Sequence, residues 1–212
     1  LHGSSAASDV YKRQAMGWFD LDLSDSVRPS FRAEKLTECT LPITLVLLEG
    51  GVVGVIAAKV YQVSPFVLAV ITAAPMFANL SSFAWNRIAA GRAKVQLACL
   101  LQAAVLLCVL AVALAPINDV GALILVASMV ISRVLVAGLI TIRSVIWSLN
   151  YARSNRAQAT GQLQMIASLV TVVIASAVGP FLDQYPDGLS LLYAVGTAVG
   201  LLGIVFFRRV SV

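Results

Sequence analysis

The chain has little charge and almost no histidine. Asp, Glu, Lys and Arg together make up 12% of its 212 residues, and the single histidine is His2. Three cysteines, Cys39, Cys99 and Cys108, lie in or beside apolar runs without a CxxC pair. Because protein metal sites are usually built from clustered His, Cys and carboxylate side chains, the sequence predicts neither a metal ion nor a cofactor. The cysteines are expected to be small buried apolar side chains.

Apolar residues are what the chain has in excess. They form 59% of the sequence, and the mean hydropathy is +0.91. A soluble domain of this length cannot bury that much apolar surface, so a lipid bilayer is the expected partner. The net charge of +5 does not indicate nucleic acid, because the basic residues come in twos and threes between apolar runs and form no basic face.

The first forty residues differ from the rest. Residues 1–14 show no apolar periodicity, and "DVYKRQ" (9–14) resembles a translated sequencing adapter, so this stretch is excluded from functional reasoning. Met16 is then a candidate start, with a fragment boundary as the alternative. Residues 15–40 are polar and lack the apolar core of a signal peptide. They are expected to form a cytosolic lead-in.

Six apolar segments follow, each near the ~20 residues that a helix needs to cross about 30 Å of hydrocarbon. Helices are expected because strands leave backbone groups unpaired in lipid unless a barrel closes, and these runs lack strand alternation. The sequence therefore predicts an all-α membrane protein with one six-helix transmembrane bundle over 41–209. Its helices are expected at about 41–62, 65–86, 94–115, 120–145, 162–182 and 190–207.

The positive charges predict the orientation of the bundle. If six helices alternate, nearly all Lys and Arg lie on one side, whereas the other side has Lys59 and three aspartates. The first group is Arg28, Arg32, Lys35, Arg87, Arg92, Lys94, Arg143, Arg153, Arg156, Arg208 and Arg209. By the positive-inside rule both termini are expected to be cytoplasmic. The expected location is the cytoplasmic (inner) membrane of a bacterium.

Two charges lie near membrane depth, Glu49 in the first segment and Arg133 in the fourth. Counting residues from the inner edge at ~1.5 Å each places them at ~12 Å and ~13 Å, so the two side chains could meet. A buried charge costs at least ~2.5 kcal/mol and needs a partner or water. The pair could simply pin two helices together, but a water-filled cavity that binds substrate or a proton is the favoured interpretation, because such residues often mark transport pathways.

Polar residues also recur at helical spacing on two other segments. They are Thr72, Asn79, Ser82 and Asn86 in the second segment, and Gln164, Ser168 and Thr171 in the fifth. Such side chains can line a pathway, or they can bond their own backbone or a neighbouring helix. Pro75 is expected to kink the second helix.

Small residues predict helix contacts and bends. Gly50 and Gly54 flank the carboxylate of the first segment, and their spacing is typical of close helix packing, as is that of Gly196, Gly200 and Gly203 in the sixth. Gly179 and Pro180, in "SAVGPFLD", are expected to bend or stop the fifth helix.

Over residues 30–209 this arrangement resembles the amino-terminal six-helix half of a major facilitator superfamily transporter. The loop "WNRIAAGRAK" is similar to the family's loop between helices two and three, with Asn86 in place of the usual acidic residue. Its other matching residues are Arg87, Gly91, Arg92 and Lys94. Arg133 and Gly138 are similar to the family's Arg and Gly of helix four, at a spacing one residue longer, and Gly179–Pro180 is similar to the fifth-helix motif of antiporters.

The resemblance implies a secondary transporter that moves a small solute by alternating access, with helices one, two, four and five around a central cavity. It places Glu49, Asn79, Arg133 and Ser168 on those helices. It also implies a carboxy-terminal half of the same chain as the missing partner. Coupling to protons, with Glu49 as their carrier, is a separate hypothesis. The alternatives are a six-helix structural membrane subunit with a dry interior and an intramembrane enzyme. The enzyme is disfavoured because no His, Asp-rich motif or activated Ser or Cys accompanies the spans.

Overall fold

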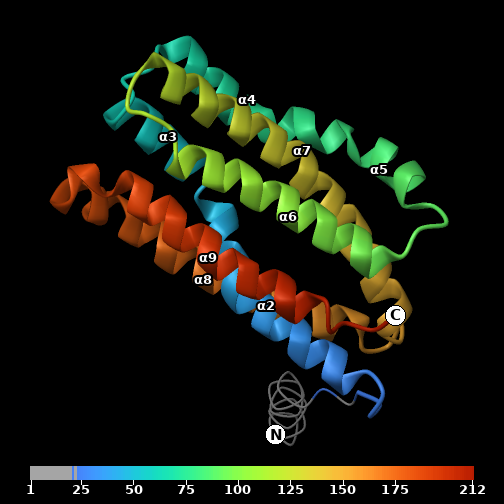
Figure 1. Cartoon of the computed structure of the whole chain (residues 1–212). Helices are drawn as coiled ribbons and strands as arrows, with labels where there is room; N and C mark the ends of the chain where they lie inside the picture. The colour runs from blue at the N-terminus through green and yellow to red at the C-terminus, as the bar shows by residue number, and fades with distance from the viewer. Residues whose placement is uncertain (1–20, 22) are drawn as a thin grey trace, which may run out of the picture.

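The computed structural model describes residue 21 and residues 23–212, and all regular elements among these residues are helices (Figure 1). They are α2 (Arg28–Val46), α3 (Gly50–Lys59), α4 (Pro65–Leu80), α5 (Ser82–Ala89), α6 (Lys94–Ala113), α7 (Asp119–Asn150), α8 (Arg156–Gln184), the 3-10 turn η1 (Pro186–Gly188) and α9 (Leu189–Phe207). Five spans are long and apolar enough to cross a membrane, and α4 with α5 makes a sixth if that bent pair is one span. The predicted all-α membrane architecture is confirmed.

The first helix begins earlier than the sequence suggests. Helix α2 starts at Arg28, inside the expected lead-in of 15–40, and Pro29 occupies its first turn, where a missing N–H is not needed. Polar side chains on its early turns, Glu34 and Glu38 among them, are buried against other helices. The adapter-like stretch 1–14 and the candidate start Met16 lie outside the described residues.

Two of the expected spans are interrupted. The first ends at Val46 and resumes at Gly50, so α2 and α3 are separated by a turn at Leu47, Leu48 and Glu49. The second bends by 42° between α4 and α5. The bend lies at Ser81, whose hydroxyl donates to the Ala78 carbonyl at 2.6 Å, a back-bond that often bends helices. Pro75 lies inside α4, six residues before this bend, and the kink expected at Pro75 stays a prediction.

The helices form two groups, one of α2, α8 and α9 and the other of α4, α5, α6 and α7 (Figure 1). The closest packing is between α6 and α7 and between α2 and α9. Helices α6 and α9 join the groups, and α3 contacts α4, α7 and α8. The α2–α3 interruption therefore lies where the two groups meet.

Glycines allow α9 to approach α2. A Cβ atom at Gly196 would lie 2.3 Å from Leu47 Cδ1, and one at Gly200 would lie 2.4 Å from Thr44 Oγ1. The Thr44 hydroxyl donates to the Gly196 carbonyl at 2.6 Å. The packing predicted for the glycines of α9 is confirmed.

The other small residues behave differently from expectation. A Cβ atom at Gly54 would meet nothing within 4 Å, because α3 packs through Val52, Val53, Ile56 and Ala57 instead. Gly50 is the first residue of α3. Helix α8 runs through Gly179 and Pro180 to Gln184, so neither residue stops it. Cys39 is exposed rather than buried.

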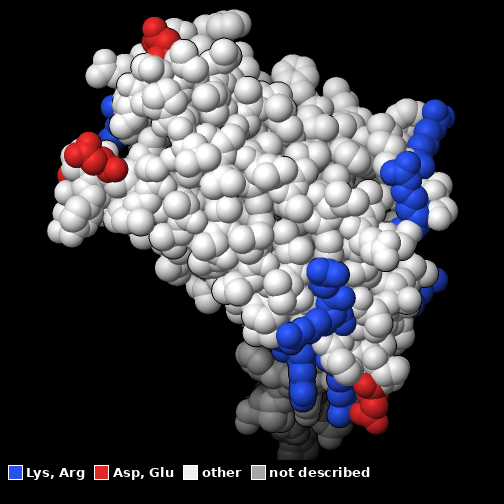
Figure 2. Space-filling view, viewed as in Figure 1, with Lys and Arg blue, Asp and Glu red and all other residues white. Residues whose placement is uncertain are grey.

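On the face that Figure 2 shows, charged residues lie at the ends of the bundle, and the surface between them is almost free of charge. At one end Lys59 of α3 forms a salt bridge of 2.7 Å with Asp183 of α8. The basic clusters lie mainly at the opposite end. This separation is the one expected of a bilayer-spanning bundle, and the cytoplasmic placement of both termini stays a prediction.

Candidate functional site

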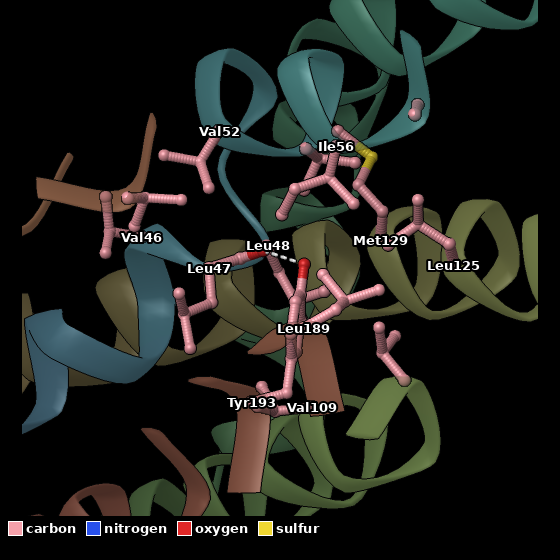
Figure 3. Packing of buried hydrophobic residues seen from close by; sticks show 14 of the residues in the cluster. Val46, Leu47, Leu48, Val52, Ile56, Val109, Leu125, Met129, Leu189 and Tyr193 are labelled. Atoms are coloured by element: carbon pink, nitrogen blue, oxygen red, sulfur yellow. Dashed lines mark hydrogen bonds between the residues drawn. The ribbon is translucent and has the colours of Figure 1, made fainter. Parts of the chain in front are cut away.

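The interruption between α2 and α3 is the centre of the candidate site. A helix end leaves backbone carbonyls without partners, and here two long side chains bind them. Arg133 of α7 donates from Nε to the Leu48 carbonyl at 3.1 Å, and from Nη2 to the carbonyls of Leu48 and Leu45. Tyr193 of α9 donates its hydroxyl to the Leu47 carbonyl at 2.7 Å (Figure 3).

The largest apolar cluster surrounds this interruption. Leu47, Leu48 and Tyr193 are at most 1% exposed, and they pack with residues of α3, α6 and α7 (Figure 3). At membrane depth, irregular backbone is tolerated only where protein buries it or where it lines a water-filled cavity. Side chains of α7 and α9 therefore stabilise the interruption by donating hydrogen bonds to its carbonyls.

Glu49 is exposed at the start of α3. Its backbone is extended, with φ −91° and ψ 141°, and its side chain does not cap the helix. Glu49 is close enough to Arg133 for the two charges to attract each other, but the described residues include no salt bridge between them. The Nε and Nη2 atoms of Arg133 bind backbone carbonyls instead. The carboxylate is thus left accessible beside a partly buried cation.

The polar stripe residues of α4, α5 and α8 are mostly exposed. Thr72, Asn79, Gln164 and Ser168 are exposed, whereas Ser82 and Thr171 are half-buried. The Thr72 hydroxyl donates to its own helix at Leu68 O, 2.9 Å away. Within the described part of the chain, the side chains of Asn79, Gln164 and Ser168 form no hydrogen bond. An amide facing hydrocarbon without a partner costs several kcal/mol, so these side chains are expected to face water or protein.

Two of the motif-like residues in the loop between α5 and α6, Gly91 and Lys94, have structural roles. Gly91 adopts φ +69°, a left-handed conformation that favours glycine after a helix end. Lys94 Nζ donates to the Ala89 carbonyl at 2.5 Å, at the end of α5. Arg87 lies over the Phe83 ring at 4.7 Å, and Asn86 and Arg92 are exposed. No carboxylate of the described residues pairs with Arg87 or Arg92.

Gly138 has a clear packing role. A Cβ atom at this position would lie 2.6 Å from the Trp85 ring, and the Trp85 indole donates to the Val134 carbonyl at 3.0 Å. The absence of a side chain at Gly138 therefore lets Trp85 of α5 pack closely on α7, near Arg133.

A second polar network, which the sequence did not reveal, joins α2 to α7. Glu38 forms a salt bridge with Arg143, and Glu34 accepts hydrogen bonds from Trp147 Nε1 at 2.5 Å and from the Tyr151 hydroxyl at 2.9 Å. Burial is nearly complete, with Glu34 0%, Glu38 3% and Arg143 7% exposed. Two pairs spaced by one helical turn, 34 with 38 and 143 with 147, were the available signal.

Aromatic groups complete this network. The Arg143 guanidinium lies over the rings of Trp147 and Phe207, at 5.2 Å and 5.6 Å from their centroids. Burial, and then the Glu34 carboxylate, raise the pKa of Tyr151, so its hydroxyl keeps the proton that it donates. This arrangement holds α2 and α7 together through buried side chains.

Together, the apolar spans, the charges at the bundle ends and the supported helix break define a multi-span helical membrane protein. No protein-family model, curated protein or solved structure matches the chain significantly. The resemblance to the major facilitator superfamily stays a prediction.

Proposed function

We propose that the chain is part of a secondary transporter that moves a small solute across the membrane by alternating access. The observation that carries the proposal is the interrupted span, where Arg133 binds the free carbonyls and Glu49 stays exposed. Discontinuous helices whose ends and unwound carbonyls lie near the bilayer midplane are typical of transporter binding sites.

The exposed polar residues support the same proposal. Asn79 and Ser168 belong to α4 and α8, the two helices that α3 contacts besides α7. Helix α8 also packs little: 11% of its most apolar stretch is buried, against 39% for α6 and α7. In this proposal the face of α4, α7 and α8 lines one side of a cavity, and a second bundle forms the other side.

Glu49 is proposed to carry the coupling proton. It lies beside a cation that holds the break in place, so the charge of Glu49 acts on the Arg133 guanidinium. Protonation removes this attraction, which loosens the contact of α7 with the break and changes the opening of the cavity. Arg133, still charged and half-buried, is then the group that meets an anionic or polar part of the solute.

Thiol labelling from water tests whether the proposed cavity exists. Ser168→Cys is made in a chain whose three cysteines are replaced by alanine, and sealed vesicles are treated with a membrane-impermeant thiol reagent. The matched control is Val173→Cys, also exposed on α8, at 58%, but on another side of the helix. The proposal predicts labelling of Ser168→Cys and protection of Val173→Cys by lipid. Protection of both positions would refute the transporter proposal and support the alternative, a structural subunit with a dry interior.

The role of Glu49 has its own measurement in the same vesicles. The labelling rate of Ser168→Cys, divided by the rate for the SDS-unfolded chain, is expected to differ between mildly acidic and neutral pH. In the Glu49→Gln background this pH dependence should disappear. Unchanged pH dependence with glutamine at this position would remove Glu49 as the proton carrier.

A further inference from the structure

A hollow with a volume of about 470 Å³ lies where α2 begins and α9 ends. Three arginines line it: Arg28 and Arg32 from α2, and Arg209 from the residues that follow α9. Asp25 is the one acidic residue among the lining residues. Figure 2 shows basic side chains gathered at this end of the bundle.

The charges in the hollow are not balanced. Asp25 pairs with Arg28 at 3.3 Å, and Arg28 Nε also donates to the Leu23 carbonyl at 3.1 Å. Arg32 and Arg209 are exposed, and they have no carboxylate partner in the part of the chain that the structure describes. Two guanidiniums, one from α2 and one from the residues that follow α9, thus face one hollow with their hydrogen-bond donors unused.

The remaining wall of the hollow is apolar. Leu36, one helical turn beyond Arg32, is 46% exposed, and Phe206 of α9 is half-buried beside it. The hollow therefore changes from basic to apolar in the direction in which α2 enters its membrane-spanning stretch. A soluble anion would use only the basic part, whereas a phospholipid matches both parts.

We propose that this hollow binds an anionic phospholipid, with its phosphate between Arg32 and Arg209 and an acyl chain over Leu36 and Phe206. Guanidinium groups bind phosphate oxygens through paired hydrogen bonds, and basic sites beside spanning helices attract anionic headgroups. The site depends on the membrane-spanning class of the protein and not on transport, so it goes beyond the proposed function.

Lipid binding to the purified full-length chain in neutral detergent tests the proposal by native mass spectrometry. Phosphatidylglycerol and phosphatidylcholine with identical acyl chains are compared. The test variant is Arg32→Gln with Arg209→Gln. The matched control is Arg92→Gln with Arg153→Gln, which removes the same charge from two other exposed arginines.

The chain is expected to prefer phosphatidylglycerol, and the test variant should bind it about thirtyfold more weakly, or ~2 kcal/mol at ~1 kcal/mol for each arginine. The control variant should keep the preference. Equal losses in both variants would show a general charge effect and overturn the proposal. A thermal melt of each variant in phosphatidylcholine, expected to be unchanged, separates lost binding from lost folding.

Two further probes distinguish a lipid from a free anion. Inorganic phosphate and glycerophosphoglycerol, which is the headgroup without acyl chains, are added in excess as competitors. The proposal predicts that both displace the lipid poorly, because neither contacts Leu36 and Phe206. Full displacement by inorganic phosphate would assign the hollow to a small soluble anion and refute the lipid site.

Discussion

Replacing Arg143 with methionine should destabilise the bundle far more than the loss of an exposed charge such as Lys59. The Arg143 and Glu38 side chains are 9% and 4% exposed, so the salt bridge is almost fully removed from solvent. Without the guanidinium, the Glu38 carboxylate has no ion-pair partner among the described residues. The nearby Glu34 carboxylate also loses its attraction to the positive charge of Arg143. Breaking one side of a buried pair typically costs about 3–5 kcal/mol, because the remaining charge stays buried.

The structure supplies a matched control at the opposite end of the bundle. Lys59 and Asp183 also join two helices by a salt bridge, but their side chains are 54% and 64% exposed. Lys59→Met should therefore cost at most about 1 kcal/mol. The double variant Arg143→Met with Glu38→Leu should recover much of the loss, because apolar replacement of both partners leaves no charge unpaired.

Reversible unfolding by SDS in mixed micelles, followed by circular dichroism, measures these free energies. The coupling between positions 38 and 143 comes from the double-mutant cycle. If Arg143→Met is no more costly than Lys59→Met, or if the double variant is worse than the single one, the buried network does not clamp α2 to α7.

Three further predictions use the same unfolding measurement. Tyr193→Phe leaves the buried Leu47 carbonyl without its donor and should cost about 1–3 kcal/mol. Gly196→Ala should cost ~1–3 kcal/mol by overpacking against Leu47, whereas Gly54→Ala, with open space, should stabilise the helix by up to about 1 kcal/mol. The raised pKa of Tyr151 means that its contribution to stability is present below its ordinary pKa of 10.0 and declines as the pH rises above that value. Between pH ~8 and ~11 the wild type should therefore lose more stability than Tyr151→Phe.

The sequence predicts the all-α membrane class, and several helix ends lie close to the expected ones, because the hydropathy of a segment follows from its local amino-acid composition. It also places Glu49 and Arg133 at similar depth, and the structure brings these residues near each other. No residue pattern before Gly50 indicates that the first span is interrupted between α2 and α3. The donors that make the break possible, Arg133 and Tyr193, lie 85 and 146 residues away from the carbonyls that they bind. Only the tertiary arrangement reveals such partners.

In the early turns of α2, hydropathy predicts the wrong environment. Glu34, Thr37 and Glu38 lower the hydropathy of their segment, so 15–40 was expected to lie in water, yet all three side chains are buried. Their partners lie on α7, beyond it or on α9: Glu38 pairs with Arg143, and the Thr37 hydroxyl donates to the Gly203 carbonyl at 3.3 Å. A polar residue is compatible with a packed membrane bundle when another helix supplies its hydrogen bonds.

The two arginines of α7, Arg133 and Arg143, differ in which nearby groups they leave accessible. Arg143 neutralises a buried carboxylate and lies over two aromatic rings inside the bundle, so its network has a structural role. Arg133 binds backbone carbonyls, and the carboxylate nearest to it, Glu49, stays exposed at the beginning of α3. If Glu49 served only to neutralise Arg133, a direct salt bridge at this depth would be the lowest-energy arrangement. Its exposure instead favours contact with water, a proton or a solute, and this difference is why the break, rather than the more elaborate α2–α7 network, is the candidate site.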